Sequence, residues 1–101
     1  MATSELSMNE MPFHDHQQDW SDEHITVTFK DFDPITGRAR FKVSEHHANV
    51  GFYYIGVYFT SGSATRVDYD GGNPNRPSIV EGTTNQRNDS LKGIKVKRVR
   101  D

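Results

Sequence analysis

The chain contains no cysteine among its 101 residues. Disulfide bonds, thiolate metal ligands and cysteine nucleophiles are therefore excluded. Long apolar segments are missing too. The longest, residues 50–59, contains glycine and falls short of the ~18 apolar residues that a membrane-spanning helix needs. Residues 1–10 have neither the basic start nor the apolar stretch of a signal peptide. We expect a soluble protein without membrane insertion, and the sequence indicates no particular compartment.

Hydrophobic residues are scarce as well, at 33% of the chain. No segment of useful length has the 3.6-residue apolar period of an amphipathic helix, and there is no internal repeat. A chain of this length is expected to form one domain around a single core. The lack of helical patterning means that this core is expected to be built from strands.

The net charge of −2 conceals a division along the chain. Residues 1–23 contain six acidic residues and no lysine or arginine, whereas residues 24–101 contain twelve basic and eight acidic residues. The first segment carries one sign of charge and no sustained apolar period, so it has little with which to offset the entropy lost on ordering. We therefore predict a flexible acidic N-terminal arm over 1–23 and a single all-β domain over 24–101.

The predicted domain begins with apolar residues at every second position. Ile25, Val27 and Phe29 alternate with polar residues, which is typical of a half-buried strand. A turn with proline and glycine follows at 33–37, and a second alternating run occupies 38–43. Two such runs around a turn predict an antiparallel hairpin.

Residues 50–60 are apolar on both faces, which is typical of a central strand covered on both sides. Gly56 in this segment indicates either a bulge or a close backbone approach. Shorter strands are predicted at 64–69, 78–81 and 91–100, the last with a bulge near its end. The pattern predicts an all-β fold, a small antiparallel sandwich or barrel of five to six strands, and does not distinguish these two forms.

Basic residues recur on the predicted outer faces of two strands. If these strands are neighbours, the side chains form one cationic surface that attracts nucleic acid or an anionic polysaccharide. The alternative is that the charges only keep exposed strands soluble and protect sheet edges from aggregation. The candidate anion-binding residues are Arg38, Arg40, Lys42, Lys95 and Lys97.

Two Asp-x-Asp pairs lie at predicted strand ends, Asp31 with Asp33 and Asp68 with Asp70. Calcium needs six to eight oxygen ligands, and four carboxylates converge on one ion if both loops lie at the same end of a sandwich. The spacing departs from that of an EF-hand loop. The alternative is that these side chains form turns by binding their own backbone.

Aromatic residues are dense between positions 52 and 69, and most are expected in the core because the domain has few other large apolar residues. Tyr54 and Tyr58 share one strand face and are the candidates for partial exposure. Exposed tyrosines on a sheet bind partner proteins, sugars or bases. Trp20 is a further candidate, as a docking anchor or an interface residue.

Catalytic patterns are lacking. No serine lies in a nucleophile elbow, and there is no glycine-rich phosphate loop. Five histidines are present, two of them in the predicted arm, which offers no rigid surroundings to orient metal ligands. We therefore hypothesise a non-enzymatic binding or protein-interaction module without a cofactor, whose partner is another protein. An anion-binding domain and a calcium-dependent module are the alternatives, and the sequence indicates neither the process nor the oligomeric state.

Overall fold

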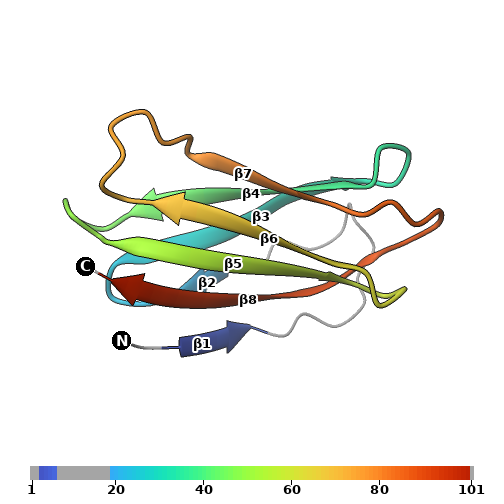
Figure 1. Cartoon of the computed structure of the whole chain (residues 1–101), viewed down its shortest axis with the longest axis horizontal. Helices are drawn as coiled ribbons and strands as arrows, with labels where there is room; N and C mark the ends of the chain where they lie inside the picture. The colour runs from blue at the N-terminus through green and yellow to red at the C-terminus, as the bar shows by residue number, and fades with distance from the viewer. Residues whose placement is uncertain (1–2, 7–18, 101) are drawn as a thin grey trace.

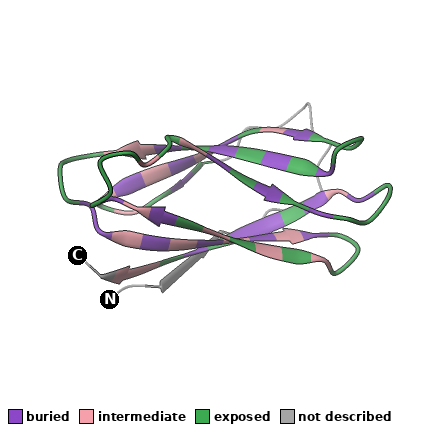
Figure 2. Ribbon diagram, turned by 45° about the horizontal axis from the view of Figure 1, so that its top comes forward, coloured by how far each residue is buried: buried purple, intermediate pink, exposed green. Residues whose placement is uncertain are grey.

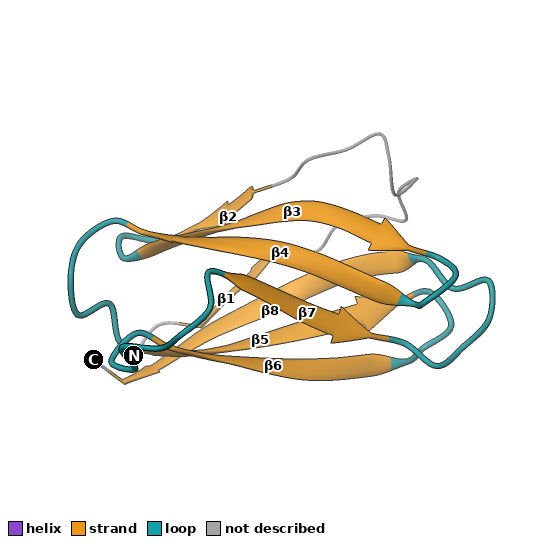
Figure 3. Cartoon of the chain, turned by 90° about the horizontal axis from the view of Figure 1, so that it is seen from above, coloured by secondary structure: helices purple, strands orange, loops and turns teal. Residues whose placement is uncertain are grey.

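The computed structural model describes residues 3–6 and 19–100, with side chains for 19–99. The described residues form eight strands in two four-stranded antiparallel sheets that pack face to face (Figures 1 and 3). The strands are β1 (Thr3–Leu6), β2 (Asp19–Ser21), β3 (Ile25–Asp33), β4 (Arg38–Glu45), β5 (Phe52–Phe59), β6 (Ala64–Asp70), β7 (Ile79–Thr83) and β8 (Leu91–Arg100). The predicted all-β fold is confirmed, and of the two forms it is the sandwich. No helix in the described part of the chain is long and apolar enough to cross a membrane.

The strand order is β1-β8-β5-β6 in one sheet, which we call sheet A, and β2-β3-β4-β7 in the other, which we call sheet B. The predicted hairpin β3–β4 lies within one sheet, and β5 and β6 form a second hairpin in the other. The pairs β4–β7 and β5–β8 instead join strands that are far apart in the chain. The chain therefore passes between the sheets four times, from β1 to β2, from β4 to β5, from β6 to β7 and from β7 to β8.

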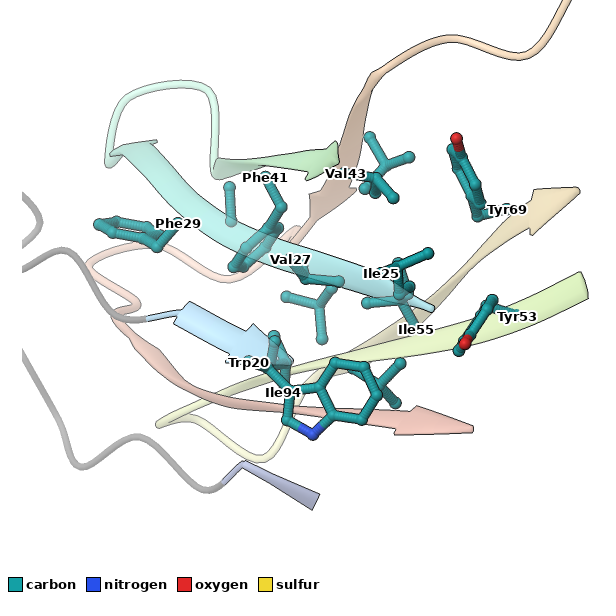
Figure 4. Packing of buried hydrophobic residues seen from close by; sticks show 14 of the residues in the cluster. Trp20, Ile25, Val27, Phe29, Phe41, Val43, Tyr53, Ile55, Tyr69 and Ile94 are labelled. Carbon is teal, nitrogen blue, oxygen red and sulfur yellow. The ribbon is translucent and has the colours of Figure 1, made fainter. Parts of the chain in front are cut away.

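Inward-facing side chains from both sheets fill the core, and many are aromatic (Figure 4). Phe29 and Phe41 pack within sheet B with ring centroids 5.8 Å apart. Phe32 of sheet B meets Phe59 of sheet A at 6.0 Å. Large rings bury much apolar area per residue, which explains how a chain with so few hydrophobic residues builds a core.

The central position predicted for residues 50–60 is confirmed, because β5 lies between β8 and β6. The predicted cover is present on one face only. Its inward side chains are buried, whereas Phe52, Tyr54 and Tyr58 on the other face are half-exposed (Figure 2). This outward face carries aromatic rings that no third layer of the described residues covers.

Two parts of the predicted N-terminal arm are strands of the sheets. β1 pairs with β8, and β2 pairs with β3. The Trp20 side chain is 6% exposed and meets the ring of Tyr53 edge-on, with centroids 6.5 Å apart. It therefore lies in the core and not at an exposed interface. Residues 7–18, where most of the predicted arm falls, lie outside the described residues.

One end of the sandwich is held together by the carboxylate of Asp89, which is 5% exposed. It accepts hydrogen bonds from the backbone and hydroxyl of Ser61 at 2.9 and 2.6 Å, from the hydroxyls of Thr84 at 2.7 Å and Thr60 at 3.1 Å, and from the Ser90 backbone at 3.0 Å. Burial alone raises its pKa, but the hydrogen bonds outweigh burial and lower the pKa to about 2. The ionised side chain therefore joins the β5–β6 turn to the loop between β7 and β8.

Gly82 of β7 lies where a side chain would press against sheet A. A Cβ atom there would lie 2.7 Å from Val57 Cγ2 and 2.8 Å from Thr65 Cγ2. Both neighbours are β-branched and stiff, so one of the sheets must shift. We expect Gly82→Ala to lower the free energy of unfolding by about 1–3 kcal/mol, measured by urea unfolding.

The control for this prediction is Gly72→Ala. Its nearest neighbour is Asp70 Oδ1 at 3.4 Å, an ordinary contact. This variant should stay within about 0.5 kcal/mol of the parent. Equal stability of the two variants would contradict the close approach of the sheets at Gly82.

Candidate functional site

The outward face of sheet A combines tyrosines with basic side chains. Across three strands, the register places Tyr54 between Lys97 and Asp68, and Gly56 between Lys95 and Arg66. All of these residues except Asp68 line a groove of about 450 Å³, together with Tyr58. We call this surface the aromatic–basic face and define it by Tyr54, Tyr58, Arg66, Lys95 and Lys97.

The floor of the groove is formed at Gly56, which has no side chain. The β5 register continues through Gly56 towards both neighbours, so of the two predicted roles a bulge is not observed. The ring of Tyr58 lies beside it, with atoms 3.0–3.3 Å from where a Cβ atom would stand. A side chain here would displace the Tyr58 ring, so glycine sets the shape of the groove.

The cations of the face are held against its rings. The guanidinium carbon of Arg66 lies 3.7 Å from the Tyr54 ring centroid, and Lys95 Nζ lies 5.4 Å from that of Tyr58. Both distances suit attraction between a cation and an aromatic face. Asp68 accepts two hydrogen bonds from Arg66, at 2.8 and 3.2 Å, and raises the pKa of that guanidinium. The face thus presents positive charge on an apolar floor.

The predicted anion-binding residues do not form one surface. Lys95 and Lys97 lie on sheet A, whereas Arg38, Arg40 and Lys42 lie on the outward face of sheet B, on the opposite side of the sandwich. A single cationic surface required these two strands to be neighbours, but β4 pairs with β3 and β7, and β8 pairs with β1 and β5.

The arginines of sheet B are also neutralised. Arg38 Nε lies 3.0 Å from Glu81 Oε1 across the β4–β7 pair. Arg40 binds Asp31 through two nitrogens, and this hydrogen bonding lowers the pKa of the Asp31 carboxyl. Both arginines on the outward face of sheet B are therefore paired with acidic side chains, as expected of residues that keep a strand soluble.

The predicted calcium ligands do not converge. Asp33 ends β3, next to the β3–β4 turn, whereas Asp70 ends β6 at the opposite end of the sandwich (Figure 1). Asp33 accepts from the Ile35 backbone at 2.8 Å, and Asp70 accepts from the Gly72 backbone at 2.9 Å, so both stabilise turns. Asp31 and Asp68 bind Arg40 and Arg66, respectively. The condition for a shared calcium site is not met, because the two loops lie at different ends.

Three histidines gather at the end of the sandwich that carries the β4–β5 loop. His24 Nδ1 lies 2.8 Å from His47 Nε2, and His46 Nε2 lies 2.7 Å from the Thr26 hydroxyl. Among the residues that the structure describes, no three histidine, aspartate or glutamate side chains are placed to bind a metal ion. His14 and His16 lie outside these residues.

The sequence interpretation missed Arg66. A signal was present, because a hairpin centred on the turn at 61–63 sets the register of its two strands. That register places Arg66 opposite Gly56, on the same face as the two tyrosines. Alternation within single strands cannot show this, since it assigns a residue to a face and not to its cross-strand neighbours.

Comparisons of the chain with protein-family models, with curated proteins and with solved structures find no match.

Proposed function

We propose that this protein is a non-enzymatic binding module that holds an acidic segment of a partner protein on the aromatic–basic face. The observation that supports this proposal is the groove of about 450 Å³, in which two tyrosines and three cations lie around a glycine floor. Tyrosine and arginine are enriched where protein interfaces gain most of their binding energy. Carboxylates of a partner match the charge of Lys95 and Lys97, and its apolar side chains match the floor.

A protein partner fits better than single-stranded nucleic acid. Proteins that bind nucleic acid strands offer open aromatic faces for base stacking, along a longer track of cations. Here the Arg66 guanidinium already covers the Tyr54 ring, and the Tyr58 ring lies beside Gly56. The basic side chains of β4, Arg38, Arg40 and Lys42, lie on the far side of the sandwich, so they cannot lengthen this track of cations.

The test is a titration of isotope-labelled protein with a synthetic peptide of alternating glutamate and tyrosine, followed by NMR at two salt concentrations. Shifted signals should map to β5, β6 and β8, and affinity should fall as salt rises, because the contact is electrostatic. We expect the double variant Lys95→Glu/Lys97→Glu to bind at least tenfold more weakly. The matched control is Lys30→Glu/Lys42→Glu, which makes the same charge change at exposed positions of sheet B and should bind like the parent.

Two further probes separate the partner classes. A thymidine oligonucleotide and heparin are titrated under the same conditions. Stronger binding of either probe than of the peptide would replace the protein partner with a nucleic acid or a polysaccharide. Binding of the peptide that is equal in both double variants would overturn the assignment of the face.

A further inference from the structure

The strand β6 forms an unusually regular sheet edge. It is the last strand of sheet A, and it pairs with β5 over seven consecutive positions without a register shift. Its sequence, Ala64–Asp70, contains no proline, glycine or lysine. Proteins often protect exposed edges with proline, with charged residues, especially lysine, or with bulges, because an open edge pairs readily with another strand. The charges on β6 are of both signs, Arg66 and two aspartates. β7 is the nearest strand of sheet B, but it does not join β6 in a sheet.

The hydrogen bonds at the two ends of the hairpin show which backbone groups face this edge. Phe59 donates to the Ser63 carbonyl at 2.9 Å, and Gly71 donates to the Gly51 carbonyl at 2.8 Å. In an antiparallel pair the direction of these groups alternates, so the odd-numbered residues of β6 bind β5. The even-numbered ones, including Arg66 and Asp68, therefore point their N–H and C=O groups away from β5.

The edge is complementary to itself. When two β6 strands pair antiparallel around a two-fold axis at Val67, Arg66 of each copy stands opposite Asp68 of the other. Shifting the axis to Arg66 places the two arginines opposite each other, and shifting it to Asp68 does the same with the aspartates. Like charges directly opposite destabilise a sheet, whereas opposite charges stabilise it. The register with its axis at Asp68 also places Arg66 opposite Asp70, but it keeps the pair of aspartates. Of the three registers, the one with its axis at Val67 is free of like charges directly opposite each other.

We propose that a second copy of this chain pairs with the first through β6, with the two-fold axis at Val67, so that the two sheets A form one continuous sheet. Val67 is half-buried in the single chain, and in this pairing each Val67 covers the other. One seven-residue strand per copy is a small interface, so the dimer is weak and depends on concentration. This inference goes beyond the proposed function and does not depend on it.

The test is sedimentation velocity of the whole chain between 10 µM and 1 mM. The parent is expected to shift from monomer to dimer across this range. Arg66→Asp places two aspartates opposite each other, and Asp68→Arg does the same with arginines, so each variant alone should dimerise at least tenfold more weakly. An equimolar mixture of the two variants restores both opposite-charge pairs and should recover the dimer. Circular dichroism confirms that each variant is folded.

Three outcomes would overturn the proposal: a parent that stays monomeric at 1 mM, a single variant that dimerises like the parent, or a mixture that fails to recover the dimer. Lys95→Glu/Lys97→Glu should still dimerise, because neither lysine lies on the edge. This double variant should lose peptide binding and keep dimerisation. The proposed function and this inference can therefore fail independently of each other.

Discussion

Replacing Trp20 with alanine is expected to lower the free energy of unfolding by about 3–5 kcal/mol. The indole is 6% exposed and packs edge-on against Tyr53, which is fully buried. Its removal leaves a cavity between β2 and sheet A. For a domain whose total stability is roughly 5–15 kcal/mol, this loss is large. Urea unfolding followed by circular dichroism measures it, because Trp20 is the only tryptophan and fluorescence disappears with it.

Two controls accompany this variant. Trp20→Phe retains an apolar ring and should cost less than half as much, whereas Asp19→Ala changes an exposed neighbour on the same strand and should stay within about 0.5 kcal/mol. A loss below 1 kcal/mol for Trp20→Ala would contradict the placement of β2 in the core.

Replacing Asp89 with alanine is expected to lower the free energy of unfolding by about 3 kcal/mol, because hydrogen bonds to a charged group contribute about 1.5–3 kcal/mol and buried donors are left without a partner. The Thr84 side chain is 4% exposed and loses its acceptor. The turn at 61–63 loses its connection to the loop between β7 and β8. For a domain of this size, each kcal/mol corresponds to roughly 4–8 °C in Tm.

The stabilisation by Asp89 depends on pH with a definite sign. Its pKa is lowered from 3.8 to about 2, so the folded state favours the ionised form. This contribution is fully present above pH 3.8 and is lost as the pH falls through 2. Asp31 and Glu45 add to the acid sensitivity of parent and variant alike, since hydrogen bonds from Arg40 and Arg76 lower their pKa values. The difference between parent and variant therefore isolates Asp89.

Unfolding measured from pH 7 to pH 2 checks this dependence. The gap in stability between the parent and Asp89→Ala should be constant down to pH 4 and narrow below it. Asp89→Asn keeps the shape of the side chain and should show an intermediate loss with the same narrowing. A gap that does not change with pH would mean that the charge of Asp89 contributes nothing.

Much of the fold was predictable because alternation is a local signal. Ile25, Val27 and Phe29 face the core as their spacing predicts, and β8 has a register irregularity near Arg98. The pairings between distant strands were not predictable. Nothing in the alternation of 38–43 or 91–100 indicates which strands lie beside them, since each strand reports its own faces only.

The short strands were missed for a different reason. β2 has three residues, and one apolar side chain between two polar ones shows no period that distinguishes it from a loop. What holds Trp20 in place is a contact with Tyr53, more than thirty positions further along the chain. The acidic charge of the surrounding segment indicated disorder, and tertiary packing overrides that local preference at this strand.

The candidate site was predictable in pieces. Tyr54 and Tyr58 were expected to be partly exposed, and Lys95 and Lys97 were expected on an outward face. The sequence interpretation assigned these pairs to separate surfaces, because their union requires β5 and β8 to be neighbours. The grouping of the lysines with Arg38, Arg40 and Lys42 required β8 and β4 to be neighbours, but these strands lie in different sheets.

The strand order also bears on how the chain folds. β1 is the first of the described strands and pairs with β8, the last, so this contact closes the longest loop of any strand pair in the structure. Loop closure over such separations is entropically unfavourable and makes β-sandwiches fold slowly, in milliseconds to seconds. The hairpins β3–β4 and β5–β6 are local and can form early. We expect β8 to dock on the second hairpin afterwards and β1 to add last, so that residues 3–6 exchange their amide hydrogens fastest among the paired strands.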